Sequence, residues 1–371
     1  MNTITTTNES CPNEWDLLAN TFNQNLYIYL TPIIIGIGLC GNILTILVFS
    51  RTDLQRQCVC VLTISLAIVD SLVLLIPALI LWLETVLKRE FSETSGFWCR
   101  THGFFDLAFT CTSSWLIVFI AFDRFIAVWL PHNKTLFTHR RTFILVLSTI
   151  LISAVISSCN FEHTNSSYSI ALLSKTNSSS LLVDVNSIIL SRCGIKHKVA
   201  YHIVGTLAIV INYFLPFLII AVANTTIIYR LSLRGIVDIT SNITLMLILV
   251  CIMHLVCTFP YQSWWLYYQV VQEKPTNCEW LKTKAKWRNF TFTIRNINYM
   301  LNFFLYSCSS RLFRDELIKL ITICLFPSEQ SNYPAYYYRR TSTYNNNTGQ
   351  RFSISRLILR RLSRTTEYTN G

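Results

Sequence analysis

CTSSWLIVFIAFDRFIAVW, residues Cys111–Trp129, is an apolar stretch that contains a pair of opposite charges near its end. Between Ser114 and Asp123 the only charged residue is Asp123 itself; Arg124 follows it, and apolar residues then continue. A helix in a soluble core rarely carries an ion pair followed by more apolar residues, whereas a helix leaving a membrane can place such a pair at the interface. The stretch therefore predicts a membrane-spanning helix with a charged end.

The composition of the whole chain also indicates a membrane protein. Of 371 residues, 52% are apolar and 13% are charged, and the mean hydropathy is +0.42. These values are unusual for soluble domains. The net charge of +12 could suggest nucleic acid, but 10 of the 31 basic residues lie from Arg311 onward, beside apolar segments. We therefore expect a lipid bilayer with anionic lipid as the counter-charge, and no nucleic-acid partner.

Seven segments are apolar and long enough to cross a bilayer, which takes about 20 residues of helix. They predict an all-α fold, a seven-transmembrane helix bundle over residues 26–310, preceded by an N-terminal segment of residues 1–25. The predicted spans are Leu26–Ser50, Cys58–Leu83, Phe97–Trp129, Thr142–Cys159, Val199–Tyr229, Ile239–Val271 and Asn289–Ser310.

Charge and glycosylation signals indicate the orientation of these spans. Basic residues occur in the loops after spans one, three and five and in the tail, as the positive-inside rule expects of cytoplasmic segments. The opposite loops also contain bases, but glycosylation acceptors occur at Asn8, Asn165 and Asn177, in the N-terminal segment and in the loop after span four. We therefore expect a multi-pass plasma-membrane protein with an extracellular N-terminus and a cytoplasmic C-terminus.

Helical spacing places several polar residues of span three on one stripe. Asp106 and Ser113 follow Cys99 at steps of seven residues, and Arg124 follows Asp106 after 18 residues, or about five turns. Cys99 and Arg124 are separated by about 37 Å of helix, so they lie at opposite faces of the bilayer. We expect the stripe to face the bundle interior, as does a matching stripe in span seven that comprises Arg295, Asn298, Asn302 and Tyr306.

Short motifs in these spans give the chain a family resemblance over residues 26–325. In their order and spacing they resemble those of the rhodopsin-like (class A) G-protein-coupled receptors, and the span-seven motif is similar to that of several invertebrate neuropeptide receptors. The motifs are Gly41-Asn42, Leu66–Asp70, Cys99, Asp123–Phe125, Pro216, Cys257–Pro260 and Asn302–Tyr306.

Four positions depart from the pattern of that family. Phe125 replaces the tyrosine after the Asp-Arg pair, and Asn224 replaces the tyrosine two turns after the span-five proline. Thr258 stands where the family carries a tryptophan in span six, and Phe303 stands where it carries a proline in span seven. These departures concern the parts that switch between conformations.

The resemblance implies that the inner ends of the spans couple to a heterotrimeric G protein. The residues that it assigns to coupling are Asp123, Arg124, Phe125, Asn302 and Tyr306. At the start of span six, where Thr240 and Thr244 stand, no acid is available to hold Arg124. Any resting-state lock must therefore come from Asp123 alone, and high basal signalling is the corollary. The alternative for the Asp-Arg pair is an ion pair that merely reaches the membrane interface.

The resemblance also implies a sodium pocket formed mainly by Asp70, Ser113, Asn298 and Asn302. A buried carboxylate needs a counter-charge or takes up a proton, and hard oxygen ligands suit a small cation. The alternative is a hydrogen-bonded polar cluster that binds no ion. No other cofactor or metal is expected.

Disulfides are a further implication of the resemblance. Cys99 and Cys193 correspond to the pair that ties span three to the long outer loop, in an oxidising compartment. Cys11 and Cys278 are the other cysteines expected on that side. They could join the N-terminal segment to the last outer loop, or remain free thiols.

Asp106 and Arg295 lie on facing stripes at the depth where amine receptors of the family place an ammonium-binding aspartate. They could form an internal ion pair, or Asp106 could meet a basic or amide group of a peptide, with Tyr261 and Gln262 nearby on span six. Arg295 could likewise meet an acidic or amidated terminus. The aromatic cage and serines that an amine receptor needs are absent, so an extracellular (neuro)peptide is the predicted ligand, and an amine or other small molecule is the alternative.

Other classes fit the sequence less well. A transporter or channel could use internal carboxylates, but the two halves show no repeat and no pair of glycine-broken helices. An enzyme is not expected, because His202 and His254 have no catalytic partner at suitable spacing. An opsin would need a lysine inside span seven for a Schiff base, and Asn289–Ser310 contains none.

The chain after span seven divides into two predicted parts. Arg311–Leu325 is an expected amphipathic helix on the inner membrane face, with Cys324 as a candidate palmitoylation site. Residues 326–371 are polar and predict a disordered cytoplasmic tail. There Ser342 and Ser363 follow arginine pairs, so kinases could phosphorylate them and recruit arrestin, or the tail is merely solvated.

Overall fold

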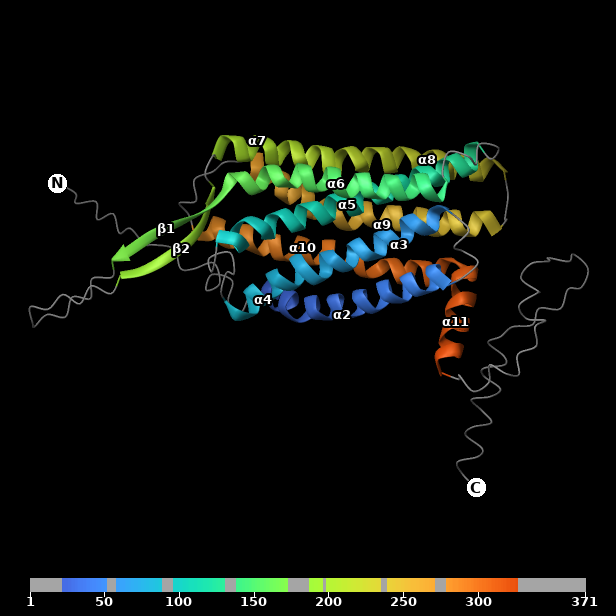
Figure 1. Ribbon diagram of the computed structural model, residues 1–371, viewed down its shortest axis with the longest axis horizontal. Helices are drawn as coiled ribbons and strands as arrows, with labels where there is room; N and C mark the ends of the chain where they lie inside the picture. The colour runs from blue at the N-terminus through green and yellow to red at the C-terminus, as the bar shows by residue number, and fades with distance from the viewer. Residues whose placement is uncertain are drawn as a thin grey trace, which may run out of the picture. The chain divides into compact units, whose positions relative to one another are not determined.

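The computed structural model describes residues 22–51, 58–88, 96–130, 138–172, 187–195, 198–234, 239–270 and 278–325. In these residues the chain forms helices that run side by side, and one two-stranded hairpin (Figure 1). The elements are α2 (Phe22–Arg51), α3 (Cys58–Val73), the π-helical turn η2 (Leu74–Ala78), α4 (Leu79–Leu87), α5 (Gly96–Trp129), α6 (His139–His163), β1 (Thr164–Leu172), β2 (Ser187–Ile195), α7 (Lys198–Ile209), the π-helical turn η4 (Val210–Phe214), α8 (Leu215–Arg234), α9 (Ile239–Val270), α10 (Cys278–Ser309) and α11 (Arg311–Leu325).

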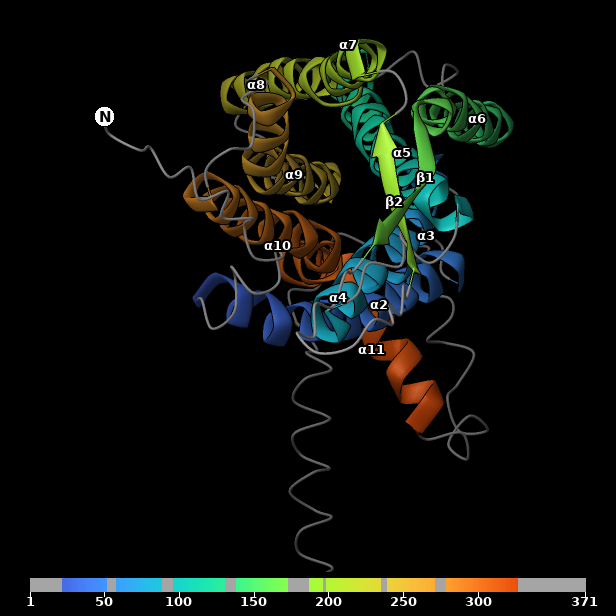
Figure 2. The same cartoon turned by 90° about the vertical axis from the view of Figure 1, so that its left-hand side faces the viewer.

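The predicted seven-helix bundle is confirmed in the described residues. One span is α3, η2 and α4 in succession, another is α7, η4 and α8, and the other five are single helices. Figure 2 views the bundle along its helices, among which α5 contacts α3, α6, α8 and α9. Six spans are long and apolar enough to cross a membrane: Gln24–Ser50, Val59–Leu87, Gly103–Trp129, His139–Ser158, His202–Leu233 and Thr244–Tyr268.

The seventh span, α10, is more polar than the other six, and several of its polar side chains are buried within the bundle. Asn289, Arg295, Asn296 and Asn298 are each at most 2% exposed. The helix begins at Cys278, eleven residues before the predicted start at Asn289, and it packs most extensively against α2 and α9. The first eleven residues of α10 include Glu279 and four bases, so hydropathy alone does not count them as part of the span.

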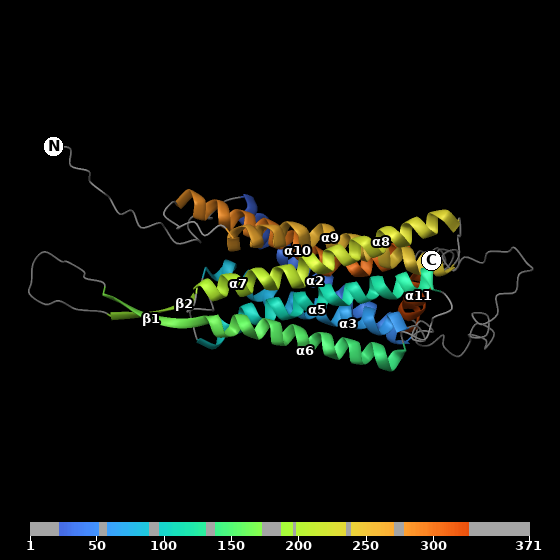
Figure 3. The same cartoon turned by 90° about the horizontal axis from the view of Figure 1, so that it is seen from above.

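The hairpin β1–β2 was not predicted; the sequence suggested only a long loop after span four. Its strands pair antiparallel, with Thr164 opposite Ile195 and Ser166 opposite Cys193. The β-branched residues of both strands and Tyr168 of β1 favour this pairing. Figure 3 shows the hairpin extending beyond the bundle at the end where α7 begins, and β1 contacts α5 and α6.

Two glycines of α2 allow α10 to approach closely. A Cβ at Gly41 would lie 2.8 Å from Cβ of Phe303, and a Cβ at Gly38 would lie 3.3 Å from Cα of Met300. Small residues at such positions permit helices to pack at short range within a membrane. Phe303, which replaces the proline of the family, therefore packs directly on the backbone of α2. Its backbone N–H allows α10 to continue as a regular helix.

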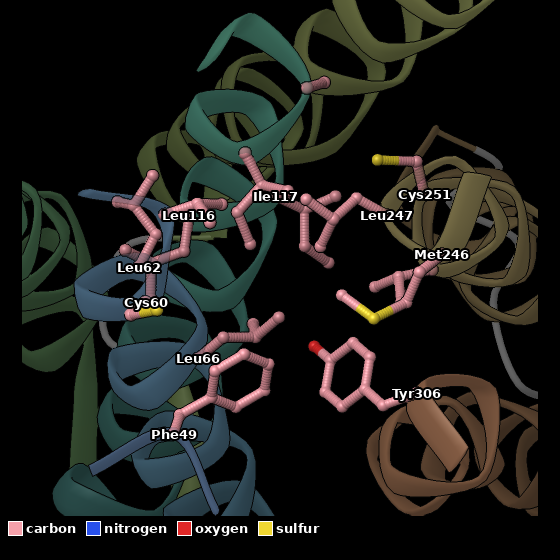
Figure 4. Close-up of a cluster of buried hydrophobic side chains, with 14 of the residues drawn as sticks. Phe49, Cys60, Leu62, Leu66, Leu116, Ile117, Met246, Leu247, Cys251 and Tyr306 are labelled. Carbon is pink, nitrogen blue, oxygen red and sulfur yellow. The ribbon is translucent and has the colours of Figure 1, made fainter. Parts of the chain in front are cut away.

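We call the half of the bundle next to the start of α11 the inner half and the half next to the hairpin the outer half, after the orientation predicted from the sequence. The inner half is held together by a buried apolar cluster (Figure 4). In the close-up, Phe49, Leu66 and Leu116 of the first three spans face Met246 of α9 and Tyr306 of α10. The ring of Phe313, in the first turn of α11, also belongs to this cluster, with its centroid 5.7 Å from that of Tyr306. Apolar contact therefore connects these six helices at this level.

Candidate functional site

An ion pair between α5 and α10 forms the centre of the outer half of the bundle. The Nη2 of Arg295 donates to Oδ1 of Asp106 at 2.8 Å, and Nη1 donates to Oδ2 at 3.1 Å. Two parallel bonds of this kind fix both position and orientation. The side chain of Arg295 is 1% exposed and that of Asp106 is 23% exposed. The internal pair, one of the two possibilities left open by the sequence, is therefore present, and its acid is the accessible partner.

Aromatic rings enclose the base of this pair. Cζ of Arg295 lies 4.2 Å from the ring centroid of Tyr261 and 4.3 Å from that of Phe292. A guanidinium over ring faces gains electrostatic attraction that grows as water is excluded. Tyr261 and Gln262, both predicted as ligand contacts, are partly buried on neighbouring positions of α9.

An aromatic ladder extends from Tyr261 toward the outer ends of α9 and α10. Tyr261 stacks on Trp264 at 5.8 Å between centroids, Trp264 contacts Tyr268 at 5.2 Å, and Tyr268 contacts Trp280 at 5.6 Å. Nζ of Lys284 lies 5.3 Å from the rings of both Tyr268 and Trp280. This ladder was not predicted from the sequence, although the aromatic stretch Ser263–Tyr268 (SWWLYY) is a signal for it.

Asp70 lies fully buried between α3, α5 and α10. Oγ of Ser113 donates to its Oδ1 at 2.8 Å, and Nδ2 of Asn302 donates to its Oδ2 at 2.6 Å. The structure thus brings together three of the four residues predicted for the sodium pocket.

Asn298, the fourth residue of that set, lies one turn before Asn302 and contacts a different partner. Its Nδ2 is 3.4 Å from Nδ1 of His254, and its buried Oδ1 has no hydrogen-bond partner among the described residues. A contact of His254 with this site was not predicted. The carboxylate, the Ser113 hydroxyl and the unpaired Asn298 oxygen are hard donors of the type that a small cation prefers.

Asp123 and Arg124 form an ion pair within α5. Nε of Arg124 donates to Oδ2 of Asp123 at 2.9 Å, and Nη2 contacts the same oxygen. The two side chains are 11% and 10% exposed, the base and the acid respectively. Phe125 stacks on Trp129 with centroids 5.9 Å apart. Asn302 and Tyr306, the other residues predicted for coupling, lie buried in α10.

The substituted switch positions are also buried. Oγ1 of Thr258 donates to the carbonyl oxygen of His254 at 2.5 Å, so the hydroxyl is satisfied within its own helix. Asn224 lies buried in α8, where the family carries a tyrosine. The structure therefore contains no large ring at either position, and Phe217 and Phe259 contact each other instead between α8 and α9, with centroids 5.8 Å apart.

One polar chain across three helices was not anticipated. Oγ of Ser153 donates to Sγ of Cys111 at 3.2 Å, and Cys111 donates to Oδ1 of Asn212 at 3.1 Å. Asn212 lies in the π-helical turn η4, which precedes Pro216 and widens the helix. No short sequence pattern marks such a chain, because its members come from separate spans.

Several predicted sites lie outside the residues whose structure is described. These are Asn8 and Cys11 in the N-terminal segment, Asn177 in the outer loop, and Ser342 and Ser363 in the tail. For five further residues the backbone is placed but the side chain is not described: Cys99, Asn165, Cys193, Cys278 and Cys324. The two disulfides, the glycosylation sites, the palmitoylation site and the phosphorylation sites therefore stay predictions.

Comparison with known families agrees with the arrangement of the spans. Residues 41–306 match the family described as "7 transmembrane receptor (rhodopsin family)". No individual sequence among the curated proteins compared with the chain shows significant similarity to it. The family match covers more than half of the 371 residues, and it includes Asp70, the Asp123–Arg124 pair and Tyr306. The chain therefore belongs to the rhodopsin-like seven-transmembrane receptors, which are the class A G-protein-coupled receptors.

Proposed function

We propose that this multi-pass membrane protein is a plasma-membrane receptor for an extracellular peptide and that it activates a heterotrimeric G protein. Its N-terminus would be extracellular and its C-terminus cytoplasmic. The observation that carries the proposal is the Asp106–Arg295 pair, whose acid is accessible while its base is enclosed by aromatic rings. A basic group of the ligand would meet the exposed edge of Asp106.

The burial of Arg295 favours a peptide over a small amine. An ammonium group that replaced Arg295 at Asp106 would leave the guanidinium buried and unpaired, which costs about 3–5 kcal/mol. A small amine makes few other contacts to offset that cost. A peptide can approach the exposed edge of Asp106 without displacing Arg295, and it can place further side chains against Tyr261, Gln262 and the aromatic ladder.

The enclosure of Arg295 also makes it a poor partner for an acidic group of the ligand. An acidic or amidated terminus could reach its guanidinium only if the rings of Tyr261 and Phe292 moved aside. A base at Asp106 is therefore the simpler arrangement.

The hairpin β1–β2 gives independent support for a peptide. A two-stranded sheet has an unpaired backbone edge on each strand, and an extended peptide can pair with such an edge. The hairpin lies at the same end of the bundle as the start of α7 and α10, which is the end nearest the ladder.

Coupling to the G protein is proposed for the opposite end. Ligand binding would favour a conformation in which α9 moves away from the bundle and Arg124 leaves Asp123 to meet the G protein. Asn302 and Tyr306 would repack in the same step. Phe125, stacked on Trp129 at the end of α5, lies beside that opening.

We further propose that the cluster around Asp70 binds sodium. The acid, the Ser113 hydroxyl and Oδ1 of Asn298 would supply oxygen ligands, and the Asn302 amide would hold the second carboxylate oxygen. Sodium bound there would stabilise the conformation in which α3, α5 and α10 are close, and so would lower agonist affinity.

A peptide-library screen with a promiscuous G-protein reporter tests the proposed function. The expected result is activation by peptides that carry a basic residue or a free N-terminus, with potency reduced about tenfold or more in Asp106→Asn. Activation by amines or lipids and by no peptide would contradict the peptide assignment. Ion or solute flux in liposomes without nucleotide exchange would contradict the receptor assignment itself.

A further inference from the structure

Trp129 and Arg230 form a cation–π contact at the end of the bundle that carries Arg124. Trp129 is the last residue of α5, and Arg230 lies in the last turns of α8. Cζ of Arg230 is 4.7 Å from the centroid of the Trp129 ring. The neighbouring side chains of Phe125 and Leu231 pack against the buried residues beneath. The contact therefore joins α5 to α8 above an apolar base.

Both partners of this contact have an unused hydrogen-bond donor. Nε1 of Trp129 and Nε of Arg230 are buried, and neither has a hydrogen-bond partner among the described residues. An indole and a guanidinium can only donate. Two adjacent buried donors without an acceptor indicate a site for a group that supplies oxygen acceptors.

The charge around the pair favours an anion as that group. Neither the Asp123–Arg124 pair nor the Asp106–Arg295 pair involves Arg230, and within the described part of the chain Arg230 forms no ion pair with an acid. Arg140, at the start of the neighbouring α6, is an exposed base at the same end of the bundle. The local surface thus carries positive charge and unused donors.

The position of the pair in the membrane favours a lipid as the source of the anion. The apolar spans of these helices end at Trp129 and at Leu233, which is the depth of the headgroups. Exposed apolar residues lead along α8 to this point, and acyl chains can pack against them: Leu218, Val222, Tyr229 and Leu233 are 60–63% exposed.

We propose that Trp129 and Arg230 bind the phosphate of an anionic phospholipid headgroup between α5 and α8. The guanidinium offers its donors in a fork that matches phosphate oxygens, and the indole N–H adds one more bond. Bound lipid would hold the ends of α5 and α8 together. The inference depends on the transmembrane position of the helices and is independent of the ligand and of coupling.

Native mass spectrometry of the full-length receptor, released from nanodiscs, tests the proposal. The nanodiscs contain phosphatidylcholine with a small fraction of phosphatidylinositol 4,5-bisphosphate. We expect the wild type to retain the anionic lipid, Arg230→Gln to lose about tenfold in retention, and Trp129→Phe, which keeps the ring without the donor, to lose several-fold. Arg230→Lys, which keeps the charge, should lose less than Arg230→Gln.

The matched control is Arg140→Gln, which removes an exposed base at the same end of the bundle. If Arg140→Gln and Arg230→Gln lose lipid retention equally, the lipid is attracted by net charge alone, and the proposed site is wrong. Equal retention by the wild type and Arg230→Gln, at unchanged melting temperature, would overturn it as well. Soluble inositol trisphosphate that binds the wild type as tightly as the lipid would also overturn it, because the phosphate would then not need to come from the membrane.

Discussion

The two ion pairs of α5 differ in what they connect. Asp106 pairs with Arg295, 189 residues further along the chain, and so joins two spans of the outer half. Asp123 pairs with Arg124, the next residue, and joins no two helices. The outer half therefore has an ion pair between helices in addition to its own buried apolar cluster around Phe292 and Tyr299, whereas the inner half is held between helices by the apolar cluster around Tyr306 alone among these features. A ligand that reaches the outer pair acts on a contact between spans, while release of the inner pair requires only a change within one helix.

The largest effect is expected from breaking the outer pair. Arg295→Leu leaves Asp106 without its partner and is expected to reduce stability by about 3–5 kcal/mol. Arg295→Lys keeps the charge but loses the two-pronged geometry, so its loss should be smaller. The melting temperature of the receptor in nanodiscs measures both variants. Equal melting temperatures for the wild type and Arg295→Leu would show that the pair does not fasten the outer half.

The second-largest loss of stability is expected from filling the close contact between α2 and α10. The position of Asn302 in α10 depends on this contact. Gly41→Ala would place a Cβ 2.8 Å from Cβ of Phe303, and the overpacking is expected to cost about 1–3 kcal/mol. Gly36→Ala is the matched control, because a Cβ there meets nothing within 4 Å. Comparable melting temperatures for the two variants would contradict the close contact.

A third prediction concerns Asp70, which lies between the two pairs. Asp70→Asn removes the negative charge that a bound sodium ion needs. We therefore expect the sodium dependence of agonist affinity to disappear: the ratio of the affinities without and with sodium should fall from about ten to one. Agonist competition curves with and without sodium chloride measure it, with choline chloride holding ionic strength constant. Ser71→Ala is the control, because the Ser71 hydroxyl bonds to the carbonyl of Ala67 in its own helix. Wild-type sodium dependence in Asp70→Asn would remove the proposed cation site.

The smallest effect is expected at the inner pair. Asp123→Asn removes the negative charge that holds Arg124. The resting state should then lose about 1 kcal/mol of stability, and basal signalling should rise about fivefold. Nucleotide exchange without ligand measures this rise, with Arg140→Gln as a control for charge at the same end. Basal exchange that is already negligible in the wild type and stays so in Asp123→Asn would show that another contact restrains Arg124.

Residue spacing was sufficient to predict the parts of the site that lie within one helix. The seven-residue steps of span three placed Asp106 and Ser113 on one stripe, and both face α10 or α3 in the structure. Hydropathy located the spans because lipid-facing residues are apolar, and it placed the start of α10 too late because the first eleven residues of that helix include five charged side chains.

Contacts between spans could not be predicted from spacing alone. The pairing of Asn298 with His254 depends on how α9 and α10 lie against each other, which no local pattern specifies. The chain from Ser153 through Cys111 to Asn212 is set in the same way by three separate spans. The aromatic ladder needs the early start of α10, since Trp280 lies before the predicted span.

A charge reversal tests the central claim most directly, namely that the outer pair both fastens two spans and presents its acid to the ligand. The double variant Asp106→Arg with Arg295→Asp is compared with both single variants. Melting temperature and peptide-stimulated nucleotide exchange are measured on each. We expect the double variant to regain most of the stability lost in the single variants, yet to lose at least about tenfold in potency for a basic peptide. Full recovery of potency, or no recovery of stability, would contradict it.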